Sequence, residues 1–379
     1  MLPFLIYLNT LVYIPHYVFI ITILYAVYKK SRFTKADFSN YLLFTIIIIV
    51  FLSTINFAAH YLLGYHREEL IPYTFLMIGS YLIAISLSPG DLKVLIYITL
   101  VECFIGYVEF LLGVKTFFTG IENYSEVDSS TGLLYFRSVY GLSNNSSALA
   151  DKIFLAYLLS YWLGLKGKKI LVVRLIFLGG IVIAFNRTSM LAIAFFHVIQ
   201  YAPVIFKSFA QFLRLRINKR LFYSLLAGVS LFVVGLYLAL VNLDVLVDQL
   251  TRKTQTVELS GRDVIWGEFF AFIKEHLLLG NGSFKYYVGY GGGLAHAHNS
   301  FIQVLATHGI IIFVFHILLI ILNLNRSNLI YVASLVVFST TQYGIFWGIS
   351  LTDIVLMVFL LSRTSSVLTI GRPATVLNE

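Results

Sequence analysis

The side chains best suited to chemistry lie in one long polar stretch, which contains Arg262 and ends at His298 and Asn299. A neutral histidine, whose unperturbed pKa is about 6.5, can accept a proton from a hydroxyl group. A guanidinium stays charged and forms paired hydrogen bonds with phosphate oxygens. These residue types indicate an anion site beside a general base. For each residue alone, the alternatives are a histidine that only caps a helix and an arginine that reaches lipid phosphates.

A third candidate, Arg187, lies in the short turn Phe185–Ser189 between two apolar segments. Taken alone, an arginine in such a turn is as readily explained as an anchor to lipid head groups. Counting the membrane spans places it on the same side as Arg262 and His298, which favours one shared site.

His296 and His298 are close enough in the sequence to suggest a metal-binding pair. However, no cysteine or carboxylate cluster accompanies them at the spacing that a zinc site needs. We therefore expect no metal and no cofactor. The glycine-rich segment 280–293 suits either a tight fold around a polar ligand or a flexible linker, and it lacks the pattern of a nucleotide-binding loop.

The composition assigns these residues to a membrane protein. The chain has 379 residues, of which 59% are hydrophobic and 12% charged, and its mean hydropathy is +0.87. A soluble domain needs more polar surface than this. We expect an all-α polytopic membrane protein, in which residues 1–379 form a single integral membrane domain. The expected spans are 4–28, 41–63, 71–88, 94–113, 147–165, 170–186, 189–206, 221–243, 299–322, 329–343 and 349–362.

Lysine and arginine residues concentrate in alternate loops, which identifies the cytoplasmic side by the positive-inside rule. The net charge of +9 is then a topology signal and not a sign of nucleic-acid binding. The chain would have about eleven spans. Pro15 could split the first segment into two helices, which would give twelve.

The opposite, outer side carries two long loops, 114–146 and 244–298. Long loops in compact proteins are usually functional or disordered. Within the second, Ser260 and Asp263 form a capping box, and apolar residues of helical period end before Gly280. We expect an amphipathic helix over 261–279, lying on the outer membrane face or over the bundle, with Arg262 in its first turn.

Several short motifs occur in a fixed order along the chain. Arg187 opens R-T-S-M, Arg262 belongs to S-G-R-x-x-x-W, and L-G-N-G-S-F follows. His298 opens H-N-S-F-x-Q-x-L-x-x-x-G at the start of the next span, and an asparagine-containing stretch with Asn145 precedes an earlier one. This ordered set resembles the O-antigen polymerase and O-antigen ligase superfamily, over roughly residues 137–322.

The resemblance implies a metal-independent glycosyltransferase of the bacterial inner membrane, with its site facing the periplasm. The donor would be an oligosaccharide on undecaprenyl pyrophosphate, and the other partners would be membrane lipids and a chain-length regulator, without nucleic acid. It implies catalytic roles for His298, Arg262 and Arg187. Substrate-binding roles would fall to the following residues: Arg137, Lys152, Asn145 and Asn299.

Within the superfamily, a polymerase joins lipid-linked repeat units, whereas a ligase moves the finished glycan to the lipid A core. We favour the polymerase, because the match is loose outside the core motifs. A protein O-oligosaccharyltransferase would share the donor. A polysaccharide flippase or other transporter is the alternative from another class, but it would predict inverted repeats with charged residues at the midplane, which the sequence does not display.

The acidic residues within expected spans include Glu102, Glu109 and Asp353. Glu102 and Glu109 are seven residues apart on one face of the fourth span. They suit a polar groove for sugar, or pairing with a basic neighbour such as Arg174, and we favour pairing. Asp353 lies near the outer start of the last span, where it could face the cavity.

Overall fold

The computed structural model is largely helical and describes residues 1–11, 18–34, 37, 40–64, 71–117, 138–213 and 261–361, with side chains left out for 203–213. The first group of helices is α1 (Leu2–Leu8), α2 (Val18–Lys30), α4 (Tyr41–Leu62), α5 (Phe75–Ser86) and α6 (Pro89–Leu112). The second is α8 (Ser146–Trp162), α9 (Lys168–Ile183), α10 (Arg187–Leu213) and α13 (Arg262–Glu275). The strands β1 (Val288–Tyr290) and β2 (Gly293–Ala295) precede α14 (Ser300–Ile321), α15 (Leu329–Ser339) and α16 (Leu351–Leu361).

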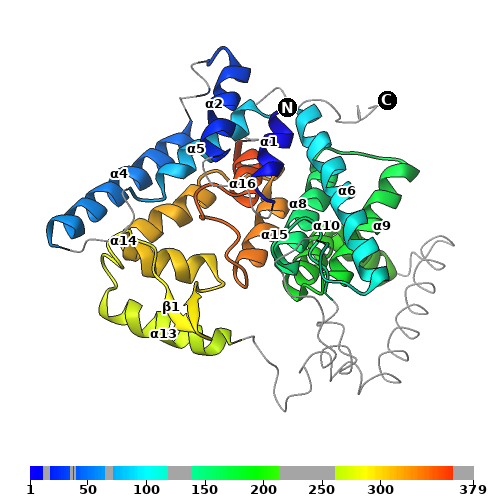
Figure 1. Ribbon diagram of the computed structural model, residues 1–379. Helices are drawn as coiled ribbons and strands as arrows, with labels where there is room; N and C mark the ends of the chain where they lie inside the picture. The colour runs from blue at the N-terminus through cyan, green and yellow to red at the C-terminus, as the bar shows by residue number, and fades with distance from the viewer. Residues whose placement is uncertain are drawn as a thin grey trace.

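Two buried helices lie at the centre of the arrangement. In α16 every residue from Leu351 to Leu360 is buried, and α8 is buried over most of its length. Figure 1 shows α4, α13 and α14 on one side of this centre and α6, α9 and α10 on the other. Helix α14 packs on α4, α10 on α15, and α6 on both α8 and α9.

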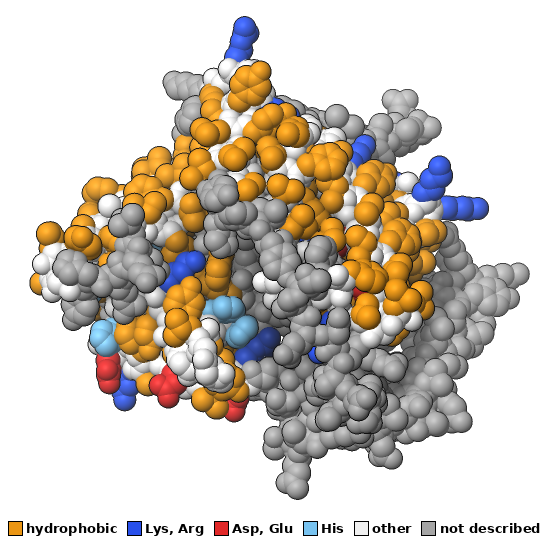
Figure 2. Space-filling model, in the orientation of Figure 1, with side chains coloured by type: hydrophobic (Ala, Val, Ile, Leu, Met, Phe, Trp, Pro, Cys, Tyr) orange, Lys and Arg blue, Asp and Glu red, His pale blue; other side chains and the backbone are white. Residues whose placement is uncertain are grey.

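The outer surface of the bundle is apolar, as a lipid-facing surface must be. On α4 the exposed residues include Phe44, Ile47, Phe51 and Ile55, which recur every three or four positions and form one stripe. Figure 2 shows hydrophobic side chains spread over this region of the surface, while acidic side chains gather over α13. Within the described residues, α4, α6 and α14 are each long and apolar enough to cross a membrane. These features agree with the expected all-α membrane protein.

The first expected span is wrong in one respect. Instead of a single helix over 4–28, the chain forms α1, which ends at Leu8, and a separate α2 from Val18. The expected span 221–243 lies outside the described residues. The count of eleven or twelve spans stays a prediction.

Helix α14 is interrupted at Gly309, where the backbone angles are φ 76° and ψ 175°. The segment that follows α13 fills the interruption with its own backbone. The Asn281 N–H donates to the Ala306 carbonyl at 2.8 Å, the Ser283 N–H to the Thr307 carbonyl at 2.9 Å, and the Ile310 N–H to the Leu277 carbonyl at 2.8 Å. Polar backbone groups released by the break therefore find partners, as a membrane interior requires.

The outer segment is thus attached to the bundle. The amphipathic helix expected over 261–279 forms as α13, but it ends at Glu275, and its N-cap is Gly261 without a side-chain hydrogen bond, so the expected capping box is wrong. Its buried Ile265, Phe269 and Ile273 pack in one cluster with Ala297 and Ala306. The short hairpin of β1 and β2 follows, in antiparallel register. This packing brings the start of α13 and the start of α14 to the same face of the molecule.

Candidate functional site

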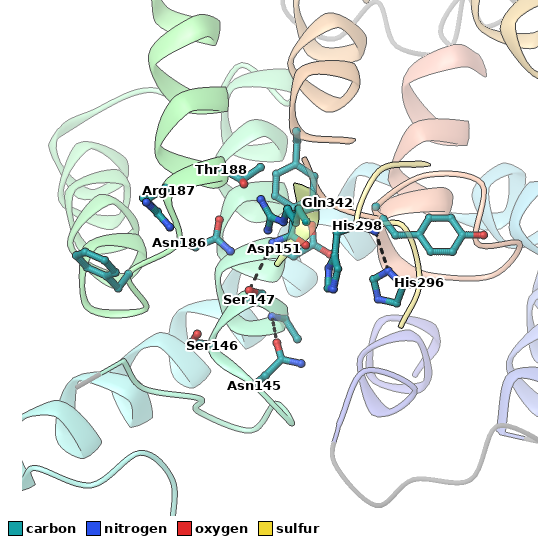
Figure 3. Close-up of a pocket in the computed structure, with 16 residues that line it drawn as sticks. Asn145, Ser146, Ser147, Asp151, Asn186, Arg187, Thr188, His296, His298 and Gln342 are labelled. Atoms are coloured by element: carbon teal, nitrogen blue, oxygen red, sulfur yellow. Dashed lines mark hydrogen bonds between the residues drawn. The ribbon is translucent and has the colours of Figure 1, made fainter. Parts of the chain in front are cut away.

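A cavity of about 420 Å³ lies where five segments of the chain meet (Figure 3). Its walls come from the start of α8, the start of α10, the start of α13, the segment between β2 and α14, and the end of α15. The lining residues are Asn145, Ser146, Ser147, Ala148, Asp151, Phe185, Asn186, Arg187, Thr188, Arg262, His296, His298, Phe338, Gln342, Tyr343 and Gly344.

The cavity brings together four of the residues that the sequence singled out. Arg187, Arg262 and His298, the three expected catalytic residues, all line it, and so does Asn145. They come from positions far apart in the chain, so their proximity arises from the fold and not from local sequence. Two guanidinium groups and an imidazole lining one cavity can bind an anionic group next to a proton acceptor.

Helix N-termini add to the positive potential of this cavity. Asn145 caps α8, with its Oδ1 accepting from the Ala148 N–H at 2.8 Å, and Asn186 Oδ1 accepts from the Ser189 N–H at 2.8 Å at the start of α10. Arg262 is the first residue of α13. The N-terminal end of a helix carries a partial positive charge and favours anions. Three such ends and two arginines make the cavity suited to a phosphate group.

The two histidines lie against each other at the cavity wall, with ring centroids 4.1 Å apart. Burial lowers the pKa of His298, and the positive charge of Arg262 lowers this pKa further. A hydrogen bond with Gln342 acts in the opposite direction, but the pKa of His298 is still lowered from its usual value of 6.5. Burial also lowers the pKa of His296, to about 4. Both imidazoles are therefore neutral near pH 7. A neutral imidazole can accept a proton.

The backbone at His298 is held in a sparsely populated conformation. Its φ of 49° lies in the left-handed region, and its N–H donates to His296 Nδ1 at 3.1 Å. Neutral His296 consequently carries its proton on Nε2. Another cavity residue, Phe185, has the same φ of 49°. Strained backbone of this kind recurs at functional sites, where the surroundings impose it.

Two motif residues hold the chain just before His298. Trp266 Nε1 donates to the Ala297 carbonyl at 2.5 Å, and the Ala297 N–H donates to Gln303 Oε1 at 2.8 Å. Gln303 Nε2 in turn donates to the Tyr286 carbonyl at 2.7 Å. The tryptophan and glutamine of the sequence motifs thus act together as a backbone clamp on Ala297.

Asn299 does not line the cavity, and its side chain instead fixes the start of α14. Its Oδ1 accepts from the N–H groups of Phe301 and Ile302, at 2.9 and 3.1 Å, and caps α14. Its Nδ2 donates to the Thr340 carbonyl at 2.7 Å, which ties the start of α14 to the end of α15. A substrate-binding role for Asn299 stays a prediction.

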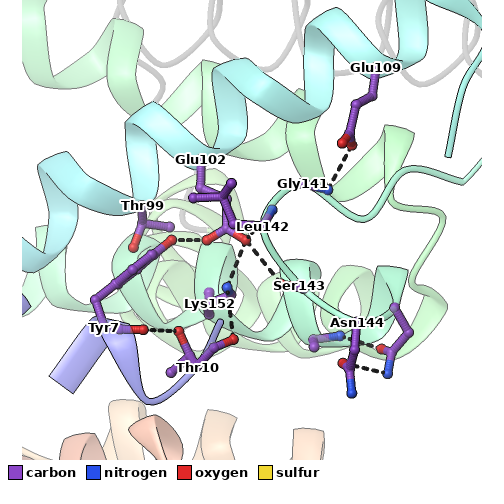
Figure 4. Close-up of polar contacts among 12 residues, drawn as sticks. Tyr7, Thr10, Thr99, Glu102, Glu109, Gly141, Leu142, Ser143, Asn144 and Lys152 are labelled. Carbon is purple, nitrogen blue, oxygen red and sulfur yellow. Dashed lines mark hydrogen bonds and ion pairs between the residues drawn. The ribbon is translucent and has the colours of Figure 1, made fainter. Parts of the chain in front are cut away.

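Lys152 is buried and lies outside the lining residues. Its Nζ forms an ion pair with Glu102 Oε1 at 2.7 Å (Figure 4). Glu102 also accepts from the Leu142 N–H and from Ser143 Oγ, both at 3.0 Å, and from the Tyr7 hydroxyl. The favoured pairing of Glu102 is confirmed, but with Lys152.

Among the residues that the structure describes, neither of the other charged groups considered with Glu102 forms the expected ion pair. Arg174 donates to the carbonyls of Ser160 and Leu165 at 2.9 and 3.1 Å. Glu109 accepts from the Gly141 N–H at 2.7 Å. Glu102 and Glu109 therefore hold the backbone of the loop that leads into α8.

Of the remaining candidates, Arg137 lies outside the described residues. Asp353 does not line the cavity. Its carboxylate accepts from the Phe346 N–H at 2.6 Å and from Ser350 Oγ at 2.9 Å, and Ser350 Oγ caps α16 by accepting from the Asp353 N–H at 2.9 Å. The sequence reasoning missed Asp151, and it weighed His296 only as a metal ligand. Within the described residues, no three His, Cys, Asp or Glu side chains group as a metal site would require.

Residues 172–317 match the family described as O-antigen ligase, a range that includes Arg187, Arg262 and His298. A search of curated proteins gave no match. The match confirms the predicted resemblance to the O-antigen polymerase and ligase superfamily over this part of the chain, and it suggests a membrane enzyme of glycosyltransferase type.

Proposed function

We propose, starting from an O-antigen ligase family domain at residues 172–317, that this protein is a surface-polysaccharide polymerase. It would transfer a glycan from undecaprenyl pyrophosphate to another lipid-linked repeat unit at the outer face of the bacterial inner membrane. The observation that carries the proposal is the convergence of Arg187, Arg262 and His298 on one cavity. Chain lengthening of this kind needs a stabilised departing diphosphate and an activated hydroxyl, and the cavity has groups suited to both.

The arginines bind the diphosphate in this account. Arg187 and Arg262 start helices α10 and α13, so the guanidinium groups and the helix N-termini act on the same anion. As the glycosidic bond breaks, negative charge grows on the departing diphosphate. Preorganised positive groups stabilise that charge in the transition state, which is the largest contribution in many transferases.

His298 acts as the general base. The acceptor hydroxyl oxygen forms a bond to the anomeric carbon, while the bond between that carbon and the diphosphate oxygen breaks and its electron pair leaves with the lipid diphosphate. The hydroxyl proton passes to the neutral imidazole of His298. Since burial and Arg262 lower the pKa of His298, the ring is available as an acceptor at neutral pH.

A ligase that transfers the finished glycan to the lipid A core is the second candidate. The description of the matching family favours it. The chemistry at the donor is the same in both reactions, and only the acceptor differs. We favour the polymerase because the family match leaves residues 1–171 and 318–379 uncovered, and polymerases are the more diverse branch.

Surface polysaccharide from a strain without this gene, complemented with the wild-type gene or with His298→Ala, separates these functions on a gel. Core carrying a single repeat unit is the result expected for a polymerase. Bare core with long lipid-linked glycan would identify a ligase instead. A full ladder in the deletion strain would overturn both and favour a transporter.

A further inference from the structure

Asp151 is a carboxylate on the cavity wall that has no role in the proposed transfer by Arg187, Arg262 and His298. It lies four residues after Ser147 and three after Ala148 on α8, and all three line the cavity. Residues at these spacings share one face of a helix. Figure 3 shows Asp151 among the side chains of this wall.

The two carboxylate oxygens of Asp151 have different surroundings. Oδ2 accepts from Thr352 Oγ1 at 2.9 Å, which ties α8 to α16. Oδ1 is shielded from solvent and accepts no hydrogen bond within the described residues. A shielded carboxylate oxygen without a donor costs free energy, and the rare examples in native proteins call for an explanation.

A structural role at the helix contact explains only half of this arrangement. A threonine–asparagine pair would tie α8 to α16 equally well without the cost of a carboxylate. The adjacent cation in the chain, Lys152, is already in an ion pair with Glu102. The carboxylate therefore suits a group that enters the cavity and carries a hydrogen-bond donor.

The chemistry of the substrates identifies that group. The diphosphate is anionic and would be repelled by Asp151, so it belongs with Arg187 and Arg262. Sugar hydroxyl groups are neutral donors, and hydrogen bonds to a carboxylate are stronger than those between neutral groups. We propose that Asp151 is a substrate-contacting residue that accepts a hydrogen bond from a sugar hydroxyl in the cavity. This inference rests on the proposed glycosyl transfer.

Two substitutions separate sugar binding from the helix contact. In Asp151→Asn, the amide oxygen can still accept from Thr352, but the atom in place of Oδ1 becomes an NH₂ group that cannot accept from a hydroxyl. In Thr352→Val, the tie to α16 is lost while the carboxylate stays. Both proteins would be purified in detergent and compared with wild type on an undecaprenyl-diphosphate-linked repeat unit.

We expect Asp151→Asn to lower kcat/KM by about 10- to 100-fold, the range for losing a hydrogen bond to a charged group. A rise in KM for the acceptor or for the donor would say which sugar Asp151 contacts. Thr352→Val should stay within about threefold of wild type, since a single neutral donor is removed. A kcat/KM for Asp151→Asn within about twofold of wild type would overturn the proposal, and so would an equal loss in both variants.

A binding measurement keeps this inference distinct from the proposed function. Undecaprenyl diphosphate without sugar should bind to Asp151→Asn at least as tightly as to wild type, because a repelling charge has been removed. The sugar-bearing lipid should bind about tenfold more weakly or worse. If wild type transfers no glycan, the proposed function fails, while this difference in affinity would still support the sugar contact. Equal weakening for both lipids contradicts it.

Discussion

Individual charge states decide what the cavity can do. His298 is neutral because burial and the charge of Arg262 both lower its pKa from 6.5. A base of this kind loses activity as the pH falls through its pKa and keeps it above. The cavity therefore combines permanent positive charge on two arginines with an imidazole that stays unprotonated beside them.

This gives a prediction about pH. The acid limb of kcat/KM, measured from about pH 4 to 8 on the purified protein, should have its midpoint below 6.5, since the pKa of His298 is lowered. In Gln342→Leu the limb should move further toward acid, because the hydrogen bond with Gln342 raises the pKa of His298. A midpoint above 6.5 in the wild-type protein would contradict the role of His298.

The sequence predicts a functional residue where that residue belongs to a motif. Arg187, Arg262 and His298 are identified by their neighbours in the chain, and the cavity contains all three. The place of Asp151 in the cavity wall could not be predicted from the sequence, because Asp151 belongs to no motif and lies within an apolar helix. Its orientation becomes known only from the packing of α8 against α16. Lys152 was expected near the substrate, but its charge is taken up by Glu102.

At the scale of elements, the position of His298 depends on a backbone clamp. Gln303 accepts from the Ala297 N–H and donates to the carbonyl of Tyr286, which lies 17 residues earlier in the chain. One side chain thus connects the start of α14 to the segment that follows α13. The motif therefore supplies a structural contact as well as the histidine.

Gln303→Leu should therefore destabilise the protein and reduce transfer. It leaves two backbone groups without partners, at about 1–3 kcal/mol each. We expect a lower melting temperature in detergent and a loss of kcat/KM of about tenfold or more.

Thr54→Val in α4 is the control for this variant. The Thr54 hydroxyl donates to the Val50 carbonyl of its own helix at 2.7 Å, so its removal breaks no contact between elements. This control should melt and turn over as wild type does. Wild-type melting and turnover in Gln303→Leu as well would contradict the clamp.

The interruption of α14 is not predictable from the sequence. The span 299–322 has the pattern of one apolar helix, but Gly309 leaves the helical conformation because the segment after α13 supplies partners for the released backbone groups. Those partners come from a separate element of the chain. Local pattern predicts a helix and carries no sign of the insertion.

Gly309→Ala tests this contact between elements. A Cβ at position 309 would lie 2.2 Å from the Leu278 carbonyl oxygen, and the φ of 76° is itself unfavourable for alanine. We expect a loss of several degrees in melting temperature and weaker transfer. Gly267→Ala is the matched control, because a Cβ there meets nothing within 4 Å. Equal melting temperatures for the two variants would refute the close packing.

For the whole molecule, composition and charge distribution predict the class of fold. The apolar stripe on α4 and the long apolar helices agree with a membrane protein. The first segment shows the limit of this reasoning, since hydropathy could not decide between one helix and the pair α1 and α2. The shape of the cavity could not be predicted either, because it depends on packing among five separate segments.

The orientation in the membrane is a prediction at this scale. A cysteine introduced at Gly289 in β1 should react with a membrane-impermeant maleimide in intact spheroplasts, whereas one at Gly167, before α9, should react only after the membrane is opened. The native Cys103 is buried and should stay unlabelled. The reverse pattern would place the cavity on the cytoplasmic side and exclude a donor in the outer leaflet.

The most direct test of the central claim is transfer by the purified protein in liposomes containing an undecaprenyl-diphosphate-linked repeat unit. Product length would be read by mass spectrometry for wild type, Arg262→Ala, Arg262→Lys and His298→Ala. We expect a ladder from wild type, a loss of about a hundredfold or more in both alanine variants, and partial activity with lysine, which keeps the charge but not the paired hydrogen bonds. Undiminished transfer by Arg262→Ala and His298→Ala would contradict the assignment of this cavity as the active site.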